Sequence, residues 1–136
     1  MASSDALTGP RRPRPMSPHL SIYRLTITMA MSIAHRISGA ALYLGVLLLA
    51  WFLFAASADA ATFAAFSEFI QSFFGRLVLF VFTWALFHHL IGGIRHVAWD
   101  AGYGLDAPLR DQTAWATLIG GFALTIVVWG VGYAVR

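Results

Sequence analysis

Residues 37–58 read ISGAALYLGVLLLAWFLFAASA and contain no charged side chain. Their 22 residues fall within the roughly 17–25 apolar residues that a helix needs to cross a bilayer. Two further stretches without Asp, Glu or Arg, residues 77–94 and 112–135, have 18 and 24 residues. A lone strand in lipid would leave its backbone groups unpaired, so each stretch is predicted to be helical. We therefore expect an all-α membrane protein with three spans, at about residues 30–56, 75–98 and 113–135.

The composition of the whole chain points the same way. Of its 136 residues, 59% are hydrophobic and 11% are charged, whereas a soluble domain is about 25% charged. This leaves too little polar surface for a soluble enzyme or a free nucleic-acid-binding protein. We therefore expect the chain to lie in membrane lipid and to bind no nucleic acid. Cysteine is absent, which excludes disulfides, iron–sulfur ligation and cysteine nucleophiles within the chain.

The arginines predict the orientation of the spans. All nine basic residues are arginine. Seven precede the uncharged stretch 37–58 or lie between the stretches 77–94 and 112–135, and two lie on the other side. By the positive-inside rule, the N-terminus and the second loop face the cytoplasm, or the matrix of a mitochondrion. Residues 1–27, rich in Pro and Arg, are predicted to form an extended cytoplasmic arm before the three-helix domain of residues 28–136. A bacterial inner membrane is the expected location, and a mitochondrial inner membrane is the alternative.

The first loop, residues 59–74, has a pattern of its own. Its apolar residues at three- and four-residue spacing are Phe63, Phe66, Phe69, Ile70 and Phe73. This spacing predicts a short amphipathic helix in the outer interface. Simple extension of a neighbouring span fits the pattern equally well.

A first polar cluster lies at the start of the first span. Ser32, His35, Arg36 and Gly39 are spaced i, i+3, i+4 and i+7, so they share one face if the helix begins near Thr28. Ionisable groups within a span are costly unless they are paired or solvated, which makes this stripe a candidate site. The alternative is that Arg36 only extends to lipid headgroups.

A second cluster lies at the end of the second span, where residues 88–96 read HHLIGGIRH. His89 and His96 are seven residues apart and therefore share a face. Imidazole is an axial ligand of haem iron, and Gly92 and Gly93 would let a flat macrocycle approach the helix. The alternative is that His88 and His89 only form hydrogen bonds between helices.

The depth of His89 fits such a ligand. It lies five residues inside the end of the uncharged run, or about 8 Å at about 1.5 Å per residue. Donors and cations near the boundary on the same side could meet the haem propionates. These residues are His35, Arg36, Arg95 and His96.

Three segments carry a family resemblance: RPMSPHLSIYR at residues 14–24, SIAHRISG at 32–39 and HLIGGIRHVAWD at 89–100. Together they resemble the cytochrome b subunit of succinate dehydrogenase, the larger membrane anchor of respiratory complex II. The resemblance runs from about residue 14 to 105, and the third span matches only in its hydrophobicity.

The resemblance implies a set of partners and cofactors. The chain would pair with a small three-helix anchor, and an iron–sulfur subunit and a flavoprotein subunit would dock on both. One haem b would be shared, with His89 as the axial ligand of the iron on this chain and the second ligand on the small anchor. His35 and Arg36 match residues near the propionates, and Ser32 and Arg36 match residues that bind quinone, here expected to be ubiquinone.

The remaining candidates are Arg95, Trp99 and Asp100, which follow the second span and have no firm role. His88 competes with His89 as the ligand. The chain would be an enzyme subunit without catalytic residues of its own. Two other functions fit the same sequence: a fumarate reductase anchor, and a haem-free membrane protein for assembly or transport in which these polar residues only join helices.

Overall fold

The computed structural model describes residues 23–135, and all regular secondary structure in this part of the chain is helical. The helices are α1 (Ile27–Ser57), α2 (Ala60–Gln71), α3 (Phe73–Asp100) and α4 (Ala107–Ala134). As expected, three of them, α1, α3 and α4, are long and apolar enough to cross a membrane, so this is a multi-pass membrane protein. Most of the predicted arm, residues 1–22, and nearly all of the 14–24 motif lie outside the described residues.

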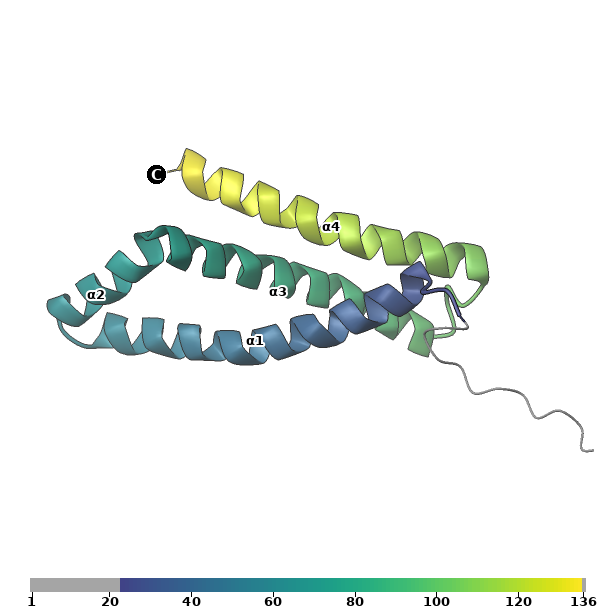
Figure 1. Ribbon diagram of the computed structural model, residues 1–136, viewed down its shortest axis with the longest axis horizontal. Coiled ribbons are helices and arrows are strands. Elements are labelled where there is room, and N and C mark those ends of the chain that lie inside the picture. The colour runs from purple at the N-terminus through teal and green to yellow at the C-terminus, as the bar shows by residue number, and fades with distance from the viewer. Residues whose placement is uncertain (1–22, 136) are drawn as a thin grey trace, which may run out of the picture.

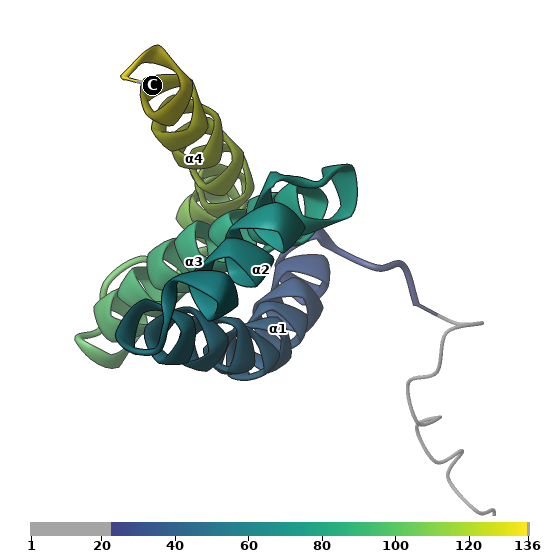
Figure 2. The ribbon, with the colours of Figure 1, turned by 90° about the vertical axis from the view of Figure 1, so that its left-hand side faces the viewer.

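The three long helices run back and forth, and α3 lies between α1 and α4 (Figures 1 and 2). At one end of the bundle the start of α1, the end of α3 and the start of α4 come together (Figure 1). Both polar clusters of the sequence lie at this end, which we call the His end. The short α2 joins α1 to α3 at the opposite end.

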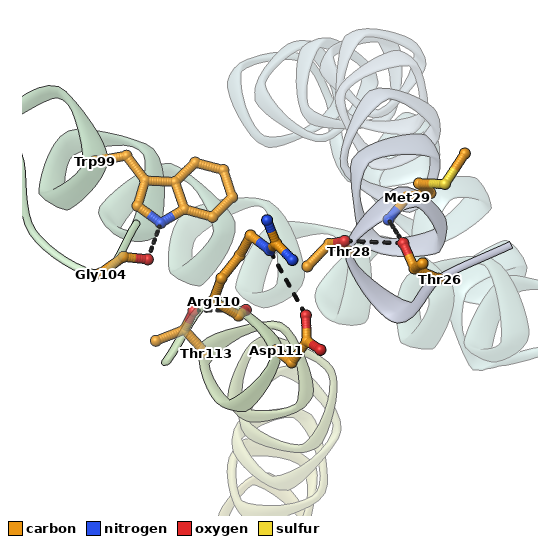
Figure 3. Close-up of polar contacts among 8 residues, drawn as sticks. All are labelled: Thr26, Thr28, Met29, Trp99, Gly104, Arg110, Asp111 and Thr113. Atoms are coloured by element: carbon orange, nitrogen blue, oxygen red, sulfur yellow. Dashed lines mark hydrogen bonds and ion pairs between the residues drawn. The ribbon is translucent and has the colours of Figure 1, made fainter. Parts of the chain in front are cut away.

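Helix α1 begins early enough to include the first polar cluster. Thr26 is its N-cap, with extended backbone angles, and its hydroxyl accepts a hydrogen bond of 3.4 Å from the backbone N–H of Met29 (Figure 3). Such a cap satisfies one of the free N–H groups of the first turn. The expectation that residues 32–39 are helical is therefore confirmed.

The first loop forms a helix of its own, α2, rather than an extension of a span. Asp59 caps it, accepting backbone N–H groups of Ala61 and Thr62 at 2.9 Å each. Its buried residue, Phe66, packs edge-on against Trp51 of α1, with ring centroids 5.1 Å apart. Phe73 is instead the first residue of α3 and is 84% exposed, so the apolar pattern of the loop is divided between two helices.

Small residues allow the helices to approach closely. A Cβ atom on Gly121 of α4 would lie 3.2 Å from the Cα atom of His88 on α3. Gly45 of α1 likewise makes room for the ring of Phe82. Gly130 and Gly132 differ, because a Cβ there would meet nothing within 4 Å among residues 23–135. Close packing of α4 on α3 therefore depends on glycine nearer the His end than at the C-terminus.

Candidate functional site

Three imidazole rings from two helices gather at the His end. The ring of His35 on α1 stacks on that of His89 on α3, with centroids 4.0 Å apart and planes 6° apart. His96, two turns further along α3, lies 5.1 Å from the same His35 ring and is tilted by 53°. The prediction that His89 and His96 share one face is confirmed, and that face is turned toward α1. We call His35, His89 and His96 the histidine cluster.

Glycines on each helix make room for the histidine of the other. A Cβ on Gly92 would lie within 2.4 Å of His35 Nδ1, and one on Gly39 would lie 3.1 Å from His89 Cε1. Real side-chain carbons do not come as close as the first of these contacts, so the His35 ring fills the space that Gly92 leaves. Gly92 was expected to face a macrocycle; only its neighbour Gly93 has open space, with nothing within 4 Å of a Cβ among residues 23–135.

The hydrogen bonds of His89 determine where its proton lies. Its Nδ1 is 3.2 Å from the Ser38 hydroxyl and 3.2 Å from the carbonyl oxygen of His35. The Ser38 hydroxyl donates its own proton to the same carbonyl at 2.8 Å. A carbonyl oxygen can only accept and the Ser38 proton is already used. The consistent assignment is therefore that His89 Nδ1 carries the proton and donates it.

This assignment leaves Nε2 of His89 with its lone pair available. Nε2 makes no hydrogen bond within residues 23–135, and His89 is only partly buried. An imidazole whose Nδ1–H is held by a backbone carbonyl has the tautomer and orientation typical of metal ligands. In the same residues no group of three or more His, Cys, Asp or Glu could hold a metal. The histidine cluster could therefore give a metal centre one ligand, with the others coming from outside this part of the chain.

His88 has different surroundings, although it is the adjacent residue. It is fully buried, at 0% exposure, and its ring stacks on Trp84 at 5.1 Å. Gly121 of α4 lies against its backbone. Successive residues point about 100° apart around a helix, which turns His88 toward α4 and His89 toward α1. A large cofactor could not reach His88 without separating α3 from α4.

Ser32 and Arg36 lie beside the histidine cluster but do not join it. Ser32 is half-buried and Arg36 is exposed, and neither makes a side-chain hydrogen bond or ion pair within residues 23–135. Within the stripe expected on α1, His35 and Gly39 contact α3, whereas Arg36 is exposed. The donors of Ser32 and Arg36 are consequently unused by the described part of the chain.

Arg95, Trp99 and Asp100 also separate from one another. Arg95 is 6% exposed and lines the α3–α4 interface, away from the side of α3 that His35 contacts. Its guanidinium carbon lies 4.8 Å from the centre of the Trp99 ring. Trp99 also touches His96 edge-on at 5.1 Å, whereas Asp100 is exposed at the end of α3. Arg95 therefore lies on the side of α3 that faces α4, and its place near the haem propionates stays a prediction.

Ser38 is the residue of the site that sequence reasoning missed. It is 1% exposed and is the side-chain partner of His89 across the two helices. The available signal was its position, one turn after His35 in the first polar cluster. A serine beside a glycine in an apolar span looks like an ordinary packing residue, so this signal is weak.

Comparisons with known proteins agree over most of the chain. Residues 10–128 match the family described as succinate dehydrogenase/fumarate reductase transmembrane subunit. The succinate dehydrogenase cytochrome b556 subunit of Paracoccus denitrificans is 39% identical over 114 residues, which cover 84% of this chain and 88% of that protein.

Two more relatives extend the comparison. The cytochrome b556 subunit of Rickettsia felis is 38% identical, over 85% of this chain and 90% of its own. The mitochondrial cytochrome b560 subunit of Bos taurus is 39% identical, over 78% of this chain and 64% of its own. The matched range includes all of α1 and α3, and with them the histidine cluster. The chain therefore belongs to the family of succinate dehydrogenase cytochrome b subunits and is a membrane subunit of the succinate dehydrogenase complex.

Proposed function

We propose that this subunit binds haem b through His89 and helps bind the quinone that receives electrons from the iron–sulfur subunit. The observation that carries the haem role is the fixed Nδ1–H of His89, held by Ser38 and the His35 carbonyl. The names of its bacterial relatives, cytochrome b556 subunits, support the type of haem. A haem-free accessory role gives no reason for an imidazole held with its Nε2 unused.

The residues around His89 fit a haem in three respects. His89 Nε2 would hold the iron, and the hydrogen bonds at Nδ1 would increase the electron donation of the ring. Gly93, one turn further along α3, leaves open space beside the helix. His35, His96 and Arg36 supply donors and positive charge suited to propionates. When bound, haem b supplies one-electron transfer; this chain supplies the ligand, its orientation and the charges around it.

The second haem ligand would come from the small anchor subunit. Metal sites in which two helices each give one histidine are common for membrane-bound haem, and residues 23–135 offer one such ligand. The exposed apolar surface of α1, which includes Leu44, Leu47 and Leu53 at 56–68% exposure, suits helix packing in lipid. The arginine distribution supports a cytoplasmic N-terminus in a bacterial inner membrane.

Ser32 and Arg36 are proposed to hold the quinone. Its reduction to quinol takes up two electrons and two protons, and it needs a donor on a carbonyl oxygen that becomes negative. The Ser32 hydroxyl and the Arg36 guanidinium donate to no other group within residues 23–135. They lie at the His end, where water can supply the protons. The chain has no cysteine and so no iron–sulfur centre of its own; in this proposal the electrons arrive from the iron–sulfur subunit.

The haem assignment is tested by His89→Ala and His88→Ala in the complex purified with all its subunits. The measurement is the reduced-minus-oxidised b-type α-band per flavin, with electron paramagnetic resonance to detect loss of a bis-histidine iron. His89→Ala should lower the band or convert the remaining haem to a high-spin form, and His88→Ala should keep a normal low-spin spectrum. The opposite pattern would refute the assignment.

The quinone assignment is tested by Ser32→Ala and Arg36→Ala. Loss of a hydrogen bond to a charged group, or to an atom that becomes charged in the reaction, costs about 1.5–3 kcal/mol. The rate of quinone reduction should therefore fall roughly 10- to 150-fold. Succinate oxidation with an artificial acceptor should stay nearly unchanged, because that route bypasses the membrane subunits. Equal loss of both activities would show that the substitutions act on assembly and not on quinone.

A further inference from the structure

A cavity of about 310 Å³ lies between α3 and α4 at the His end. On the α3 side its walls include Ile91, Ile94 and Arg95, and on the α4 side Leu109 and Ala116. Tyr103, in the loop between the two helices, completes one edge. We call it the α3–α4 cleft. Apart from Arg95, its lining is mostly apolar, and Ile94 and Tyr103 are 61% and 73% exposed, so it opens to the outside of the bundle.

Arg95 is a buried cation with no counter-charge among residues 23–135. It is 6% exposed, and its Nε and Nη1 atoms are buried without a hydrogen-bond partner among residues 23–135. The one ion pair in that range joins Arg110 to Asp111 at 3.7 Å (Figure 3) and does not involve Arg95. The one partner of the Arg95 guanidinium within residues 23–135 is the Trp99 ring, whose centre lies 4.8 Å from the guanidinium carbon. A buried guanidinium of this kind needs an anion, because desolvation without pairing is costly.

Three other polar side chains of the cleft already use their donors. The Thr113 hydroxyl donates to the Arg110 carbonyl at 3.0 Å, and the Trp99 indole N–H donates to the Gly104 carbonyl at 3.1 Å (Figure 3). The Thr117 hydroxyl donates to the Thr113 carbonyl at 2.8 Å. The cleft thus combines an unpaired guanidinium with walls that otherwise suit hydrocarbon.

From this combination we propose that the α3–α4 cleft binds a membrane phospholipid, with the phosphate on Arg95 and an acyl chain along the apolar walls. Guanidinium binds phosphate through two parallel N–H bonds and is the usual choice for such groups. Arg95 directly follows the last residue of the uncharged run 77–94, which is the depth of lipid headgroups. A free phosphate ion would leave the apolar walls uncovered, and so the whole lipid accounts for more of the cleft.

The test uses the succinate dehydrogenase complex purified with all subunits in mild detergent, with bound phospholipid measured by mass spectrometry per flavin. Arg95→Gln removes the charge, and Ala116→Leu fills the cleft while Arg95 stays in place. Arg110→Gln is the matched control, because Arg110 is an arginine at the same end whose side chain is 44% exposed. The haem-to-flavin ratio verifies assembly of every variant.

Both cleft variants should lose one tightly bound phospholipid per complex relative to the natural sequence, and Arg110→Gln should keep it. Unchanged lipid in an assembled Arg95→Gln or Ala116→Leu complex would overturn the proposal. Unchanged lipid in both variants, together with inorganic phosphate that binds the natural complex but not Arg95→Gln, would identify an anion site without a lipid and overturn it as well. Release of a partner subunit from Arg95→Gln at unchanged lipid content would identify a partner carboxylate as the counter-charge, again against the proposal.

Discussion

The contact between Gly92 and His35 allows a prediction worked from the structure. A Cβ at residue 92 would lie 2.4 Å from His35 Nδ1, well inside the ordinary contact distance. Gly92→Ala therefore pushes the His35 ring away from α3 and breaks its 4.0 Å stacking on the His89 ring. The adjacent substitution Gly93→Ala is the control for helix packing and thermal stability only, since its Cβ meets nothing within 4 Å in the described part of the chain and its open space is the one proposed for the haem.

The expected cost follows from two opposing effects. Overpacking a well-packed site costs about 1–3 kcal/mol, and replacing glycine by alanine within a helix returns at most about 1 kcal/mol. Gly92→Ala should thus destabilise the α1–α3 contact by about 1–2 kcal/mol, a factor of roughly 5–30 in the corresponding equilibrium. Gly93→Ala lacks the first effect, so it should be neutral or slightly stabilising for the chain.

The assay is thermal unfolding of the purified complex in detergent, with haem content per flavin measured in parallel. A double-mutant cycle isolates the cause: in a His35→Ala background there is no ring to displace, and Gly92→Ala should then be nearly neutral. Gly92→Ala should lower both the unfolding midpoint and the haem content in the natural background. An equal effect of Gly92→Ala with and without the His35 ring would refute the reasoning.

Three further predictions concern other parts of the structure. Ser38→Ala removes one of the two acceptors of His89 Nδ1–H. Loss of a residue that orients a metal ligand lowers metal affinity about 10–100-fold, and we expect haem retention to fall by the lower of these factors because the His35 carbonyl remains. Unchanged haem retention would contradict the hydrogen-bond assignment. Gly121→Ala places a Cβ 3.2 Å from the His88 Cα atom and should destabilise the protein by about 1 kcal/mol. Gly130→Ala should not, because its Cβ meets nothing within 4 Å in the described part of the chain. Equal unfolding midpoints of the two variants would refute tight packing of α4 on α3 at Gly121. Hydrogen bonds from the backbone N–H and the hydroxyl of Thr62 hold the pKa of Asp59 below its usual 3.8. The α2 cap should therefore be present at neutral pH and be lost only as pH falls through that lowered pKa. Hydrogen exchange of residues 60–63, corrected for intrinsic rates, should stay constant from pH 7 to 5 and rise in Asp59→Ala, and a change between those pH values would count against the cap.

Several features followed from local periodicity alone. Residues 37–58 are apolar throughout, and lipid allows such a run little choice except helix. A helix start near Thr28 is supposed from the sequence, and Ser32 to Gly39 do fall inside α1. The seven-residue spacing of His89 and His96 puts them on one face of any helix. These are properties of one helix in isolation, and the structure agrees with them.

Other features depended on which helix lies beside which. Adjacent His88 and His89 look alike in sequence, but α4 covers the first through Gly121, and α1 meets the second through Gly39. Adjacent Gly92 and Gly93 differ for the same reason, since His35 fills the space at the first. Arg95 is one residue from His96, yet it lines the cleft toward α4 while His96 contacts His35.

The sequence by itself thus determined that this is a three-span membrane protein, which end of the bundle carries its polar residues, and which family it resembles. Only the tertiary structure decided three further points about the described part of the chain. The Nδ1 proton of His89 is held by Ser38 and its Nε2 makes no hydrogen bond there, His88 is closed off, and Arg95 is buried with no anion from residues 23–135. The physical reason is that the helical repeat fixes the angles between side chains around one axis. The neighbour that each angle faces is set by packing between helices far apart in the chain.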